Sequence, residues 1–413
     1  MKPRAVGLLP EIVVVDDTRD FAALEGEWED LYHNSPLATP FQSWAWLYSW
    51  WEFYGEHYGL RLVTARDEEG RLVGIIPLML ERRRGLRKLL FIGTGPTDYL
   101  DVLARKGWEA EVAEAGVRAL GQQVGPWQVA DLHQLRPESA AWGIFERWGG
   151  PKTRVWQDNC PTIDVKPWDE LLMSLSKNHR STTRRAVRRA EADGLRCEPV
   201  GPEDAQRAAQ RWMALHREAW RGREIAPEHL TRRFQSHLEV AVRRMTEREL
   251  GRISEFRLDG EAIASHFLVF GRDFVGEHMV GSGEQALERY QISSLYIQDG
   301  VNAALQRGSA RLDLLRGEEP YKLRWASGVV ANHRVVLGRS RMPWAPYAAY
   351  VALRTGAKRY VADAIPDYRV IRRQRPIGWI PYAAYTVLRS NVKRYASSEG
   401  APRWAKGIVD RLE

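Results

Sequence analysis

The stretch from Tyr290 to Gly328 constrains the fold more than any other part of this 413-residue chain. Between Ile292 and Leu305 its apolar residues recur at spacings of three to five, which predicts an amphipathic helix. Ser293 and Ser294 can cap the start of this helix, and Gly308 can end it. The apolar run after the glycine predicts a strand. We therefore expect a helix and a strand that pack together and lead directly into a turn.

That strand and turn carry four side chains suited to acyl transfer: Asp313, Tyr321, Lys322 and Trp325. Transfer of an acyl group to an amine needs a base, a donor for the developing oxyanion and two positioned reactants. Lys322 could donate to the oxyanion or hold an anionic substrate, and Tyr321 could donate there or protonate a leaving thiolate. Trp325 would contact substrate. The alternative is an ion pair between Lys322 and Asp313 that only fixes the turn.

A second group of polar residues follows a glycine-rich turn in the segment Phe91–Leu103, FIGTGPTDYLDVL. Asp98 and Asp101 are three residues apart, so they need not face the same way. One of them could orient the acceptor amine or act as a general base, with Tyr99 beside it in a substrate-binding role. The alternative is a structural turn in which Tyr99 packs in an interface.

Two further groups lie on predicted regular elements. Arg180 and Arg184 are one turn apart on a basic helix expected from Leu171 to Ala192, where they could hold a phosphate-bearing ligand or simply face solvent. His266 and Glu255 lie on the two strands of a predicted hairpin. A strand histidine can be a base, although it is more often a core residue with satisfied hydrogen bonds. We take both hairpin residues as catalytic candidates.

Taken in order, these stretches resemble a known family. The helix, Gly308, Asp313, Gly317 and the pair Tyr321-Lys322 resemble the closing segment of the CelD-like (BioF-like) acetyltransferases of the GNAT superfamily, whose relatives are the FemABX peptidyltransferases. The Asp-Tyr-x-Asp turn and the arginine-rich helix ending in glycine resemble two more family segments. The resemblance implies an α/β fold of the tandem GNAT type, with two mixed-sheet units, flanking helices and a helical basic tail. It also implies direct attack by an amine on an acyl thioester.

The resemblance further implies acetyl-CoA or another acyl-CoA as co-substrate. GNAT enzymes usually hold its pyrophosphate with an Arg/Gln-x-x-Gly-x-Gly/Ala loop at a helix start. The nearest match here is Gln291, Ser293 and Ser294, which open the predicted helix without the glycines. This departure keeps a Fem-type donor, aminoacyl-tRNA, as an alternative.

Cysteine usage and hydropathy set further limits. Cys160 and Cys197 are far apart and form no Cys-x-x-Cys pattern, so we expect neither a disulfide framework nor a metal site. The N-terminus lacks the apolar core of a signal peptide, and the longest apolar run is too short to span a bilayer. We therefore expect a cytoplasmic protein.

The excess of positive over negative charge lies entirely in the C-terminal tail. The net charge is +8, but residues 339–413 hold 15 basic and 5 acidic residues, which leaves the body at −2. A body this close to neutral is not expected to bind nucleic acid. With a turn at Gly149–Pro151, the pattern predicts a GNAT-like unit at 1–150, a second at 151–338 and the tail at 339–413.

The tail contains a 35-residue repeat. Trp344–Val361 and Trp379–Ala396 are identical at 11 of 18 aligned positions. Pro346 and Pro381 suit the first turn of a helix. Each copy carries tyrosines and a basic end, which favours two interfacial helices on an anionic membrane surface at its inner face. The alternative is a helical pair packed on the body.

We therefore predict an N-acyltransferase that moves an acyl group to an amine of an amino sugar or a cell-envelope or polysaccharide precursor. The small-molecule or glycan-precursor acceptor is implied by the resemblance alone. The alternative enzyme is a Fem-type aminoacyl-tRNA-dependent transferase that acts on a peptidoglycan precursor. A third hypothesis is a non-catalytic binding protein on the same fold, docked at the membrane by its tail, and the missing pyrophosphate loop is its best support.

Overall fold

The computed structural model describes residues 9–83, 85–219 and 227–364, and within them one 13-stranded sheet runs through the whole molecule. The strands are β1 (Glu11–Val15), β2 (Gly59–Arg66), β3 (Leu72–Arg83), β4 (Leu86–Phe91), β5 (Leu103–Ala104), β6 (Val129–Leu135), β7 (Lys152–Asp164), β8 (Arg196–Pro199), β9 (Gly251–Leu258), β10 (Glu261–Phe270), β11 (Val275–Ser282), β12 (Arg311–Asp313) and β13 (Gly328–Gly338). Their order in the sheet is β1-β2-β3-β4-β6-β13-β7-β12-β11-β10-β9-β8, with β5 paired to β3.

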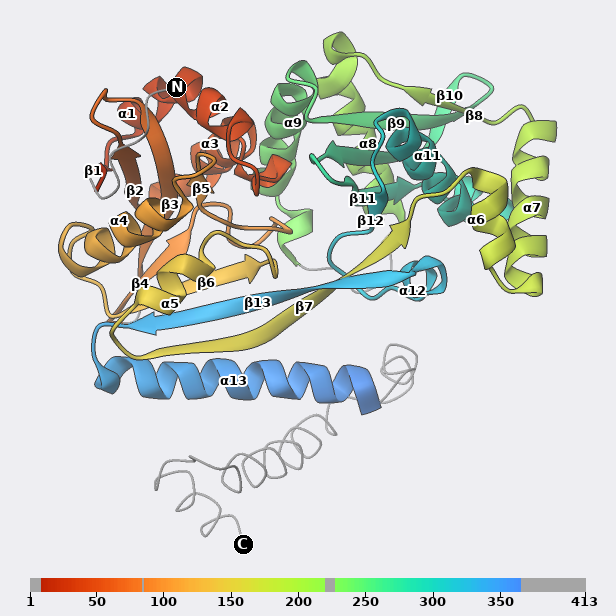
Figure 1. The fold of residues 1–413 in the computed structure, drawn as a ribbon. Coiled ribbons are helices and arrows are strands. Elements are labelled where there is room, and N and C mark those ends of the chain that lie inside the picture. The colour runs from red at the N-terminus through yellow and green to blue at the C-terminus, as the bar shows by residue number, and fades with distance from the viewer. Residues whose placement is uncertain (1–8, 84, 220–226, 365–413) are drawn as a thin grey trace, which may run out of the picture.

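Helices cover this sheet in two groups, one over each half (Figure 1). The α-helices are α1 (Thr18–Ala23), α2 (Glu25–His33), α3 (Trp44–Tyr54), α4 (Glu109–Gln122), α5 (Trp142–Arg147), α6 (Trp168–Ser174), α7 (Lys177–Ala192), α8 (Ala205–Ala219), α9 (Arg232–Glu247), α10 (Glu284–Arg289), α11 (Ile292–Gln306), α12 (Pro320–Trp325) and α13 (Arg341–Ala364). Short 3-10 helices are η1 (Pro40–Gln42), η2 (Gly55–His57), η3 (Pro202–Asp204) and η4 (Pro227–Leu230).

The two halves repeat one plan. In each, antiparallel strands lead to a parallel pair joined through helices: β4 pairs with β6 across α4, and β11 pairs with β12 across α10 and α11. The expected mixed sheets with flanking helices are therefore present. The boundary proposed after residue 150 falls between α5 and β7.

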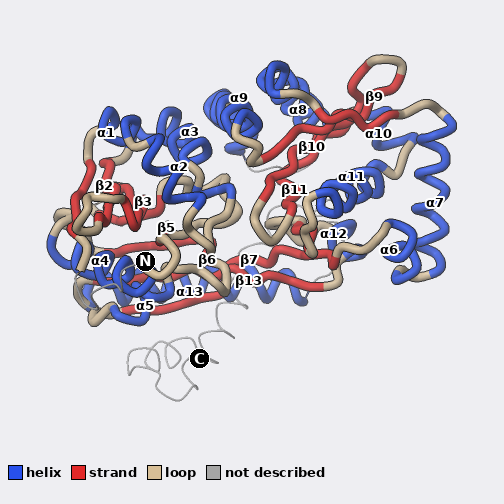
Figure 2. Tube along the Cα trace, turned by 45° about the horizontal axis from the view of Figure 1, so that its top comes forward, coloured by secondary structure: helices blue, strands red, loops and turns tan. Residues whose placement is uncertain are grey.

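The halves exchange their closing strands at the centre of the sheet. β7 follows the first half in sequence but pairs with β12 of the second, and β13 follows the second half but pairs with β6 of the first. The two exchanged strands also pair with each other along ten residues of β13, from Gly328 to Leu337. Figure 2 shows them side by side, running from one half to the other. The sheet is therefore continuous across the boundary between the halves.

Helix α3 fills the space between the halves with aromatic rings. Ser43 caps it, its Oγ accepting from the Trp46 N–H at 3.2 Å, and Trp46 and Trp50 are fully buried. Arg244 of α9 lies over the Trp44 ring and donates to Ser49 Oγ at 2.8 Å. The aromatic run from Phe41 to Tyr54 predicts a helix whose rings are too dense for one face, so that both sides pack. This is confirmed, and one of those sides faces the other half.

Three local expectations were wrong, each for a local reason. The basic helix expected from Leu171 to Ala192 is two helices, because Leu175 takes an extended conformation and Ser176 caps α7. The turn expected before Trp325 continues as the short helix α12, with Pro320 in its first turn. The apolar pattern from Val124 to Leu132 predicts a strand, but the strand begins only at Val129, because Gly125 adopts a left-handed conformation with φ of 77°.

Helix α13 holds the first copy of the tail repeat and packs on the exchanged strands (Figure 1). Trp344 Nε1 donates to the Val336 carbonyl at 3.0 Å, and Val351 is fully buried against Val129 and Val336. The expectation that Pro346 lies in the first turn is wrong, because the helix already begins at Arg341. The second copy, residues 379–396, lies outside the described residues.

Among the described residues, every helix is too short or too polar to cross a bilayer.

We expect Trp344→Ala to lower the free energy of unfolding by about 2 kcal/mol, because it removes both a half-buried indole and its hydrogen bond to β13. Urea denaturation followed by circular dichroism measures this loss. Tyr350→Ala is the control, since the Tyr350 side chain on the same helix is 54% exposed. Equal stability of the two variants would show that α13 does not depend on the Trp344 contact.

Candidate functional site

Strand β11 presents two neighbouring polar residues to opposite faces of the sheet. Glu277 lies opposite Leu268 of β10 and His278 lies opposite Phe267, so the two side chains alternate. The next residue, Met279, forms a bulge: the pairing skips it, and its φ is 64°. Bulges change the direction of side chains and are common beside active sites.

Next to these residues, β11 and β12 diverge. The two strands pair only through Val275 with Leu312 and Gly276 with Asp313. Beyond this point β11 continues to Ser282, whereas the other strand turns away through Leu315, which has a strained φ of 53°. We call this divergence the fork. Glu277 and His278 lie just beyond it, on the β11 side.

One polar cluster lies on the face of β11 that meets the first half of the molecule. His278 Nδ1 is 2.7 Å from Asp98 Oδ2, and Arg316 Nε donates to Asp98 Oδ1 at 2.9 Å. Arg316 also donates to the Gly95 carbonyl at 3.0 Å. A carboxylate from the first half is thus held by an imidazole and a guanidinium from the second.

These contacts keep Asp98 ionised and orient His278. Burial alone would raise the pKa of Asp98, but the hydrogen bond from His278 and the charges of His278 and Arg316 hold it well below its usual range. The ionised carboxylate accepts the proton on His278 Nδ1, so Nε2 is the ring nitrogen that is not engaged by Asp98. Within the described residues, this buried Nε2 has no hydrogen-bond partner.

A second carboxylate of the same cluster has a raised pKa. Tyr99 donates its hydroxyl proton to Asp313 Oδ2 at 2.7 Å, and the Leu315 N–H donates to Oδ1 at 2.9 Å. Burial raises the pKa of Asp313 to about 6, although both hydrogen bonds oppose this. Asp313 can therefore gain or lose a proton near neutral pH.

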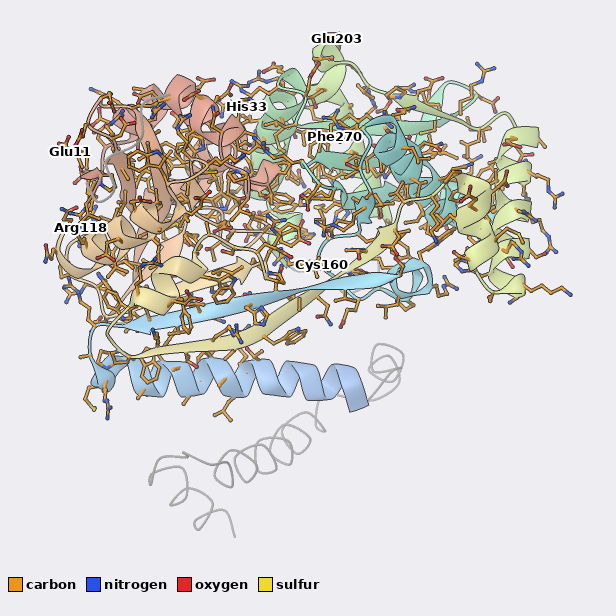
Figure 3. The ribbon with its side chains drawn as sticks, in the orientation of Figure 1. Glu11, His33, Arg118, Cys160, Glu203 and Phe270 are labelled. Carbon is orange, nitrogen blue, oxygen red and sulfur yellow. The ribbon has the colours of Figure 1, made fainter. Side chains whose placement is uncertain are left out.

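Two side chains from other elements fix the loop that carries Asp98 and Tyr99. Gln42 Nε2 donates to the Tyr99 carbonyl at 2.7 Å, and Asn332 Nδ2 on β13 donates to the Asp98 carbonyl at 3.0 Å. Cys160 on β7 lies in the same region, between the two halves (Figure 3). Burial raises the pKa of its thiol well above the usual value, so Cys160 remains protonated.

Lys322 supports the turn that follows Asp313. Its Nζ donates to the Arg316 carbonyl at 2.9 Å and lies 3.3 Å from Glu319 Oε2. The ion pair with Asp313 that the sequence left open is not formed, because Asp313 is held by Tyr99. Lys322 thus fixes the backbone of the residue whose guanidinium binds Asp98.

A second polar cluster lies on the opposite face of β11, under α11. His266 Nε2 is 2.9 Å from Asp299 Oδ2, and its Nδ1 is 3.5 Å from Glu277 Oε2. Tyr321 donates to Glu277 Oε1 at 3.3 Å. Burial would lower the pKa of His266, but the two carboxylates raise it, which favours the imidazolium. A connected chain of groups therefore links His266 to Tyr321.

Two of the sequence candidates have structural partners elsewhere. Glu255 is fully buried and ion-paired with Arg211 and Arg257 on the face under α8, opposite to His266. Asp101 accepts from Ser139 Oγ at 2.7 Å and from backbone N–H groups at the start of α5. The structure therefore separates both residues from the fork.

The phosphate and substrate candidates lie in two further places. Arg180 and Arg184 lie on α7 at the far end of the second half, where Arg184 is 3.9 Å from Asp169 (Figure 1). Trp325 is buried near them, stacked on Trp168. Neither arginine reaches the cluster around Asp98.

The three candidates for binding the donor's phosphates lie at the start of α11. Gln291 is the N-cap residue and makes no side-chain capping bond, while Ser293 is half-buried and Ser294 fully buried. The helix begins after the carboxyl end of β11, and Tyr296 in its second turn contacts Ser282 there at 2.7 Å. No side chain therefore caps the start of α11, and the helix contacts the end of β11 through Tyr296.

Sequence reasoning missed His278, Arg316, Glu277 and Asp299. Glu277 and His278 lie in β11, and Arg316 lies in the turn that follows β12. One signal was present: Glu277 and His278 are adjacent polar residues in an otherwise apolar strand, so one of them must face each side of the sheet. Among the described residues, no group of three or more metal-ligating side chains comes together.

Comparison with known proteins identifies the fold. Residues 177–323 match a family model described as an acetyltransferase (GNAT) domain. No curated protein matches the chain. Among solved structures, the chain is similar to FemX, with a TM-score of 0.53 and 11% identity over 79% of this chain and 96% of that chain. It is also similar to L-PGS from Bacillus licheniformis, with a TM-score of 0.51 and 12% identity over 82% and 96%.

A third similar structure is a conserved protein of unknown function from Bacteroides thetaiotaomicron VPI-5482, with a TM-score of 0.51 and 10% identity over 79% and 100% of the two chains. At such identities these likenesses concern the fold alone. Together with the family match, they confirm the GNAT fold and the resemblance to Fem-type proteins expected from the sequence.

The raised pKa of Asp313 predicts a pH-dependent stability difference between the native chain and Asp313→Asn. A carboxyl group whose pKa rises on folding stabilises the fold at pH values below its pKa in the unfolded chain, which is near 4. This contribution is lost as the pH rises through its pKa in the folded chain, about 6. Between about pH 4 and about pH 7, the free energy of unfolding of the native chain should therefore fall by about 2–3 kcal/mol relative to that of Asp313→Asn.

Denaturant unfolding of both proteins across this pH range measures the shift. Asp273→Asn is the control, because the Asp273 side chain is 62% exposed. A pH-independent difference for Asp313→Asn would contradict the raised pKa.

Proposed function

We propose that this protein, an acyltransferase with a GNAT-type domain over residues 177–323, transfers an acyl group from an acyl thioester to an amine at the fork. The observation that carries this proposal is the imidazole of His278. Its Nδ1 is held by the ionised carboxylate of Asp98, and its buried Nε2 has no partner among the described residues. An imidazole in this arrangement can act as the general base that takes the proton from an attacking amine, whenever its Nε2 carries no proton.

In the proposed reaction, the amine nitrogen attacks the thioester carbonyl carbon, and a C–N bond forms as the C–S bond breaks. The amine proton passes to His278 Nε2. The departing thiolate takes up the proton that His278 received, and Tyr321 can donate a hydrogen bond to it, because burial and the charge of Glu277 raise the pKa of Tyr321 well above 10 and keep it protonated. The products are an amide and a free thiol, so no oxidant or covalent enzyme intermediate is needed.

An acyl-CoA donor fits the start of α11. The first N–H groups of this helix have no side-chain cap, and Gln291 and Ser293 flank them. A pyrophosphate is a good ligand for such a helix end. Acyl-CoA would supply the activated carbonyl, while the chain's own residues bind it, orient it and move the proton.

For the acceptor, we propose the amine of an amino sugar or of a cell-envelope or polysaccharide precursor. The exposed arginines of α7 favour, as a second candidate, an aminoacyl-tRNA donor of the Fem type.

The basic tail would bring the protein to an anionic membrane. Exposed Met342 and Tyr350 on α13 support this docking, which co-sedimentation with anionic liposomes can measure.

Calorimetric titration with acetyl-CoA tests the donor. We expect the native chain to bind and Lys322→Ala to bind about tenfold more weakly, because the turn held by Lys322 loses its anchor to the Arg316 carbonyl. Lys177→Ala, which removes an exposed lysine at the start of α7, should bind as the native chain does. Absence of binding in all three would exclude acetyl-CoA and favour aminoacyl-tRNA or a non-catalytic role.

The base is tested by turnover with acetyl-CoA and glucosamine. His278→Gln should lower kcat by roughly 10²–10⁴-fold with little change in acetyl-CoA affinity, since it removes a proton acceptor rather than a binding contact. His57→Gln is the matched control, because the His57 side chain is 62% exposed. Full turnover by His278→Gln would remove the base from this mechanism.

A further inference from the structure

A separate cavity of about 440 Å³ lies at the far end of the second half. It is partly open to solvent and is lined by α6, the first turn of α7, the last turn of α12 and the residues at the ends of β7 and β13. Figure 2 shows these elements together at one end of the molecule. The volume is within the range of small-molecule sites.

Aromatic rings form one wall of this cavity. Trp325 is 4% exposed and stacks on Trp168 with ring centroids 5.7 Å apart. His179 of α7 meets the same indole edge to face at 4.7 Å. Both rings are fixed by these contacts, so the wall is preformed rather than assembled around a ligand.

The cavity has a positive rim. Lys166 and Arg324 line it, and neither forms an ion pair with a carboxylate among the described residues. The one acidic residue of the lining is Asp164, whose backbone N–H is bound to Ser327 Oγ at 2.8 Å. Burial and then the charge of Arg324 lower the pKa of His179, so the positive potential reaches the aromatic wall.

We propose that this cavity binds a small ligand that carries a phosphate or pyrophosphate group. The guanidinium of Arg324 and the ammonium of Lys166 are the side-chain types that hold phosphate oxygens, and the lining residues Leu171 and His179 can contact the remainder of such a ligand. Three serines also line the cavity, and each of their hydroxyls already has one hydrogen bond within the chain: Ser174, Ser176 and Ser327.

This site is distinct from the fork but adjoins it through α12. Trp325 is three residues after Lys322 and four after Tyr321, so the three side chains lie on one side of the short helix. The Trp325 wall is therefore one helical turn from Tyr321, which donates to Glu277 beside the fork. The inference concerns ligand binding only and does not depend on the proposed acyl transfer.

The test uses the full-length protein, inorganic pyrophosphate and the NMR signal of the His179 ring. Pyrophosphate should raise the pKa of His179, because a bound anion offsets the charge of Arg324. In Arg324→Gln the pKa of His179 without ligand should already be higher, and the affinity for pyrophosphate should fall about tenfold or more. Lys166→Gln should weaken binding in the same direction.

Arg188→Gln is the matched control. It removes the same charge from an exposed position on α7 that does not line the cavity, so pyrophosphate binding should be unchanged. Two results would overturn the proposal. One is a His179 signal that does not respond to pyrophosphate at about 10 mM, well above a millimolar Kd. The other is equal affinity in the Arg324, Lys166 and Arg188 variants, which would indicate unspecific attraction to a basic surface.

Discussion

The exchange of β7 and β13 is the constraint on which the rest of this structure depends. Each half closes its sheet with the strand that follows the other half, so the ladder from β6 through both exchanged strands to β12 is unbroken. Rotating one half against the other would break main-chain hydrogen bonds rather than slide two surfaces. The loop that carries Asp98 and Tyr99 therefore meets the fork in a fixed position, anchored by Asn332 of β13 itself.

The fixed position of this loop explains why the structure tolerates many buried polar groups near the fork. Asp98 comes from one half, whereas His278 and Arg316 come from the other, and each offsets the desolvation of its partners. On the opposite face of β11, Glu277 and Asp299 do the same for His266. Because side chains alternate between the two faces of β11, the two networks lie on opposite faces of the sheet. One holds the candidate base His278, and the other leads to Tyr321.

Local patterns in the sequence predicted the elements but not the partners. The helix before Asp313, the hairpins and the aromatic helix follow from spacing, and the structure brings Asp98, Tyr99 and Asp313 into one cluster. His278 and Arg316 were missed because their importance arises from pairing with a residue about 180 or more positions away, which no local pattern encodes. Arg180 and Arg184 had a clear pattern, but the break at Leu175 and the packing of α7 place them far from the fork.

The exchange of strands also has a consequence for how the chain is made. On the ribosome, β6 is complete at Leu135, but the strand that covers its open edge is not synthesised until residues 328–338. At ordinary elongation rates this interval lasts on the order of 10–40 s. During that time the first half exposes an unpaired apolar edge of the kind that recruits other chains. Nascent molecules on one messenger are thus at risk of closing on each other, and a chaperone that shields β6 would raise the yield of chains whose own β13 pairs with β6.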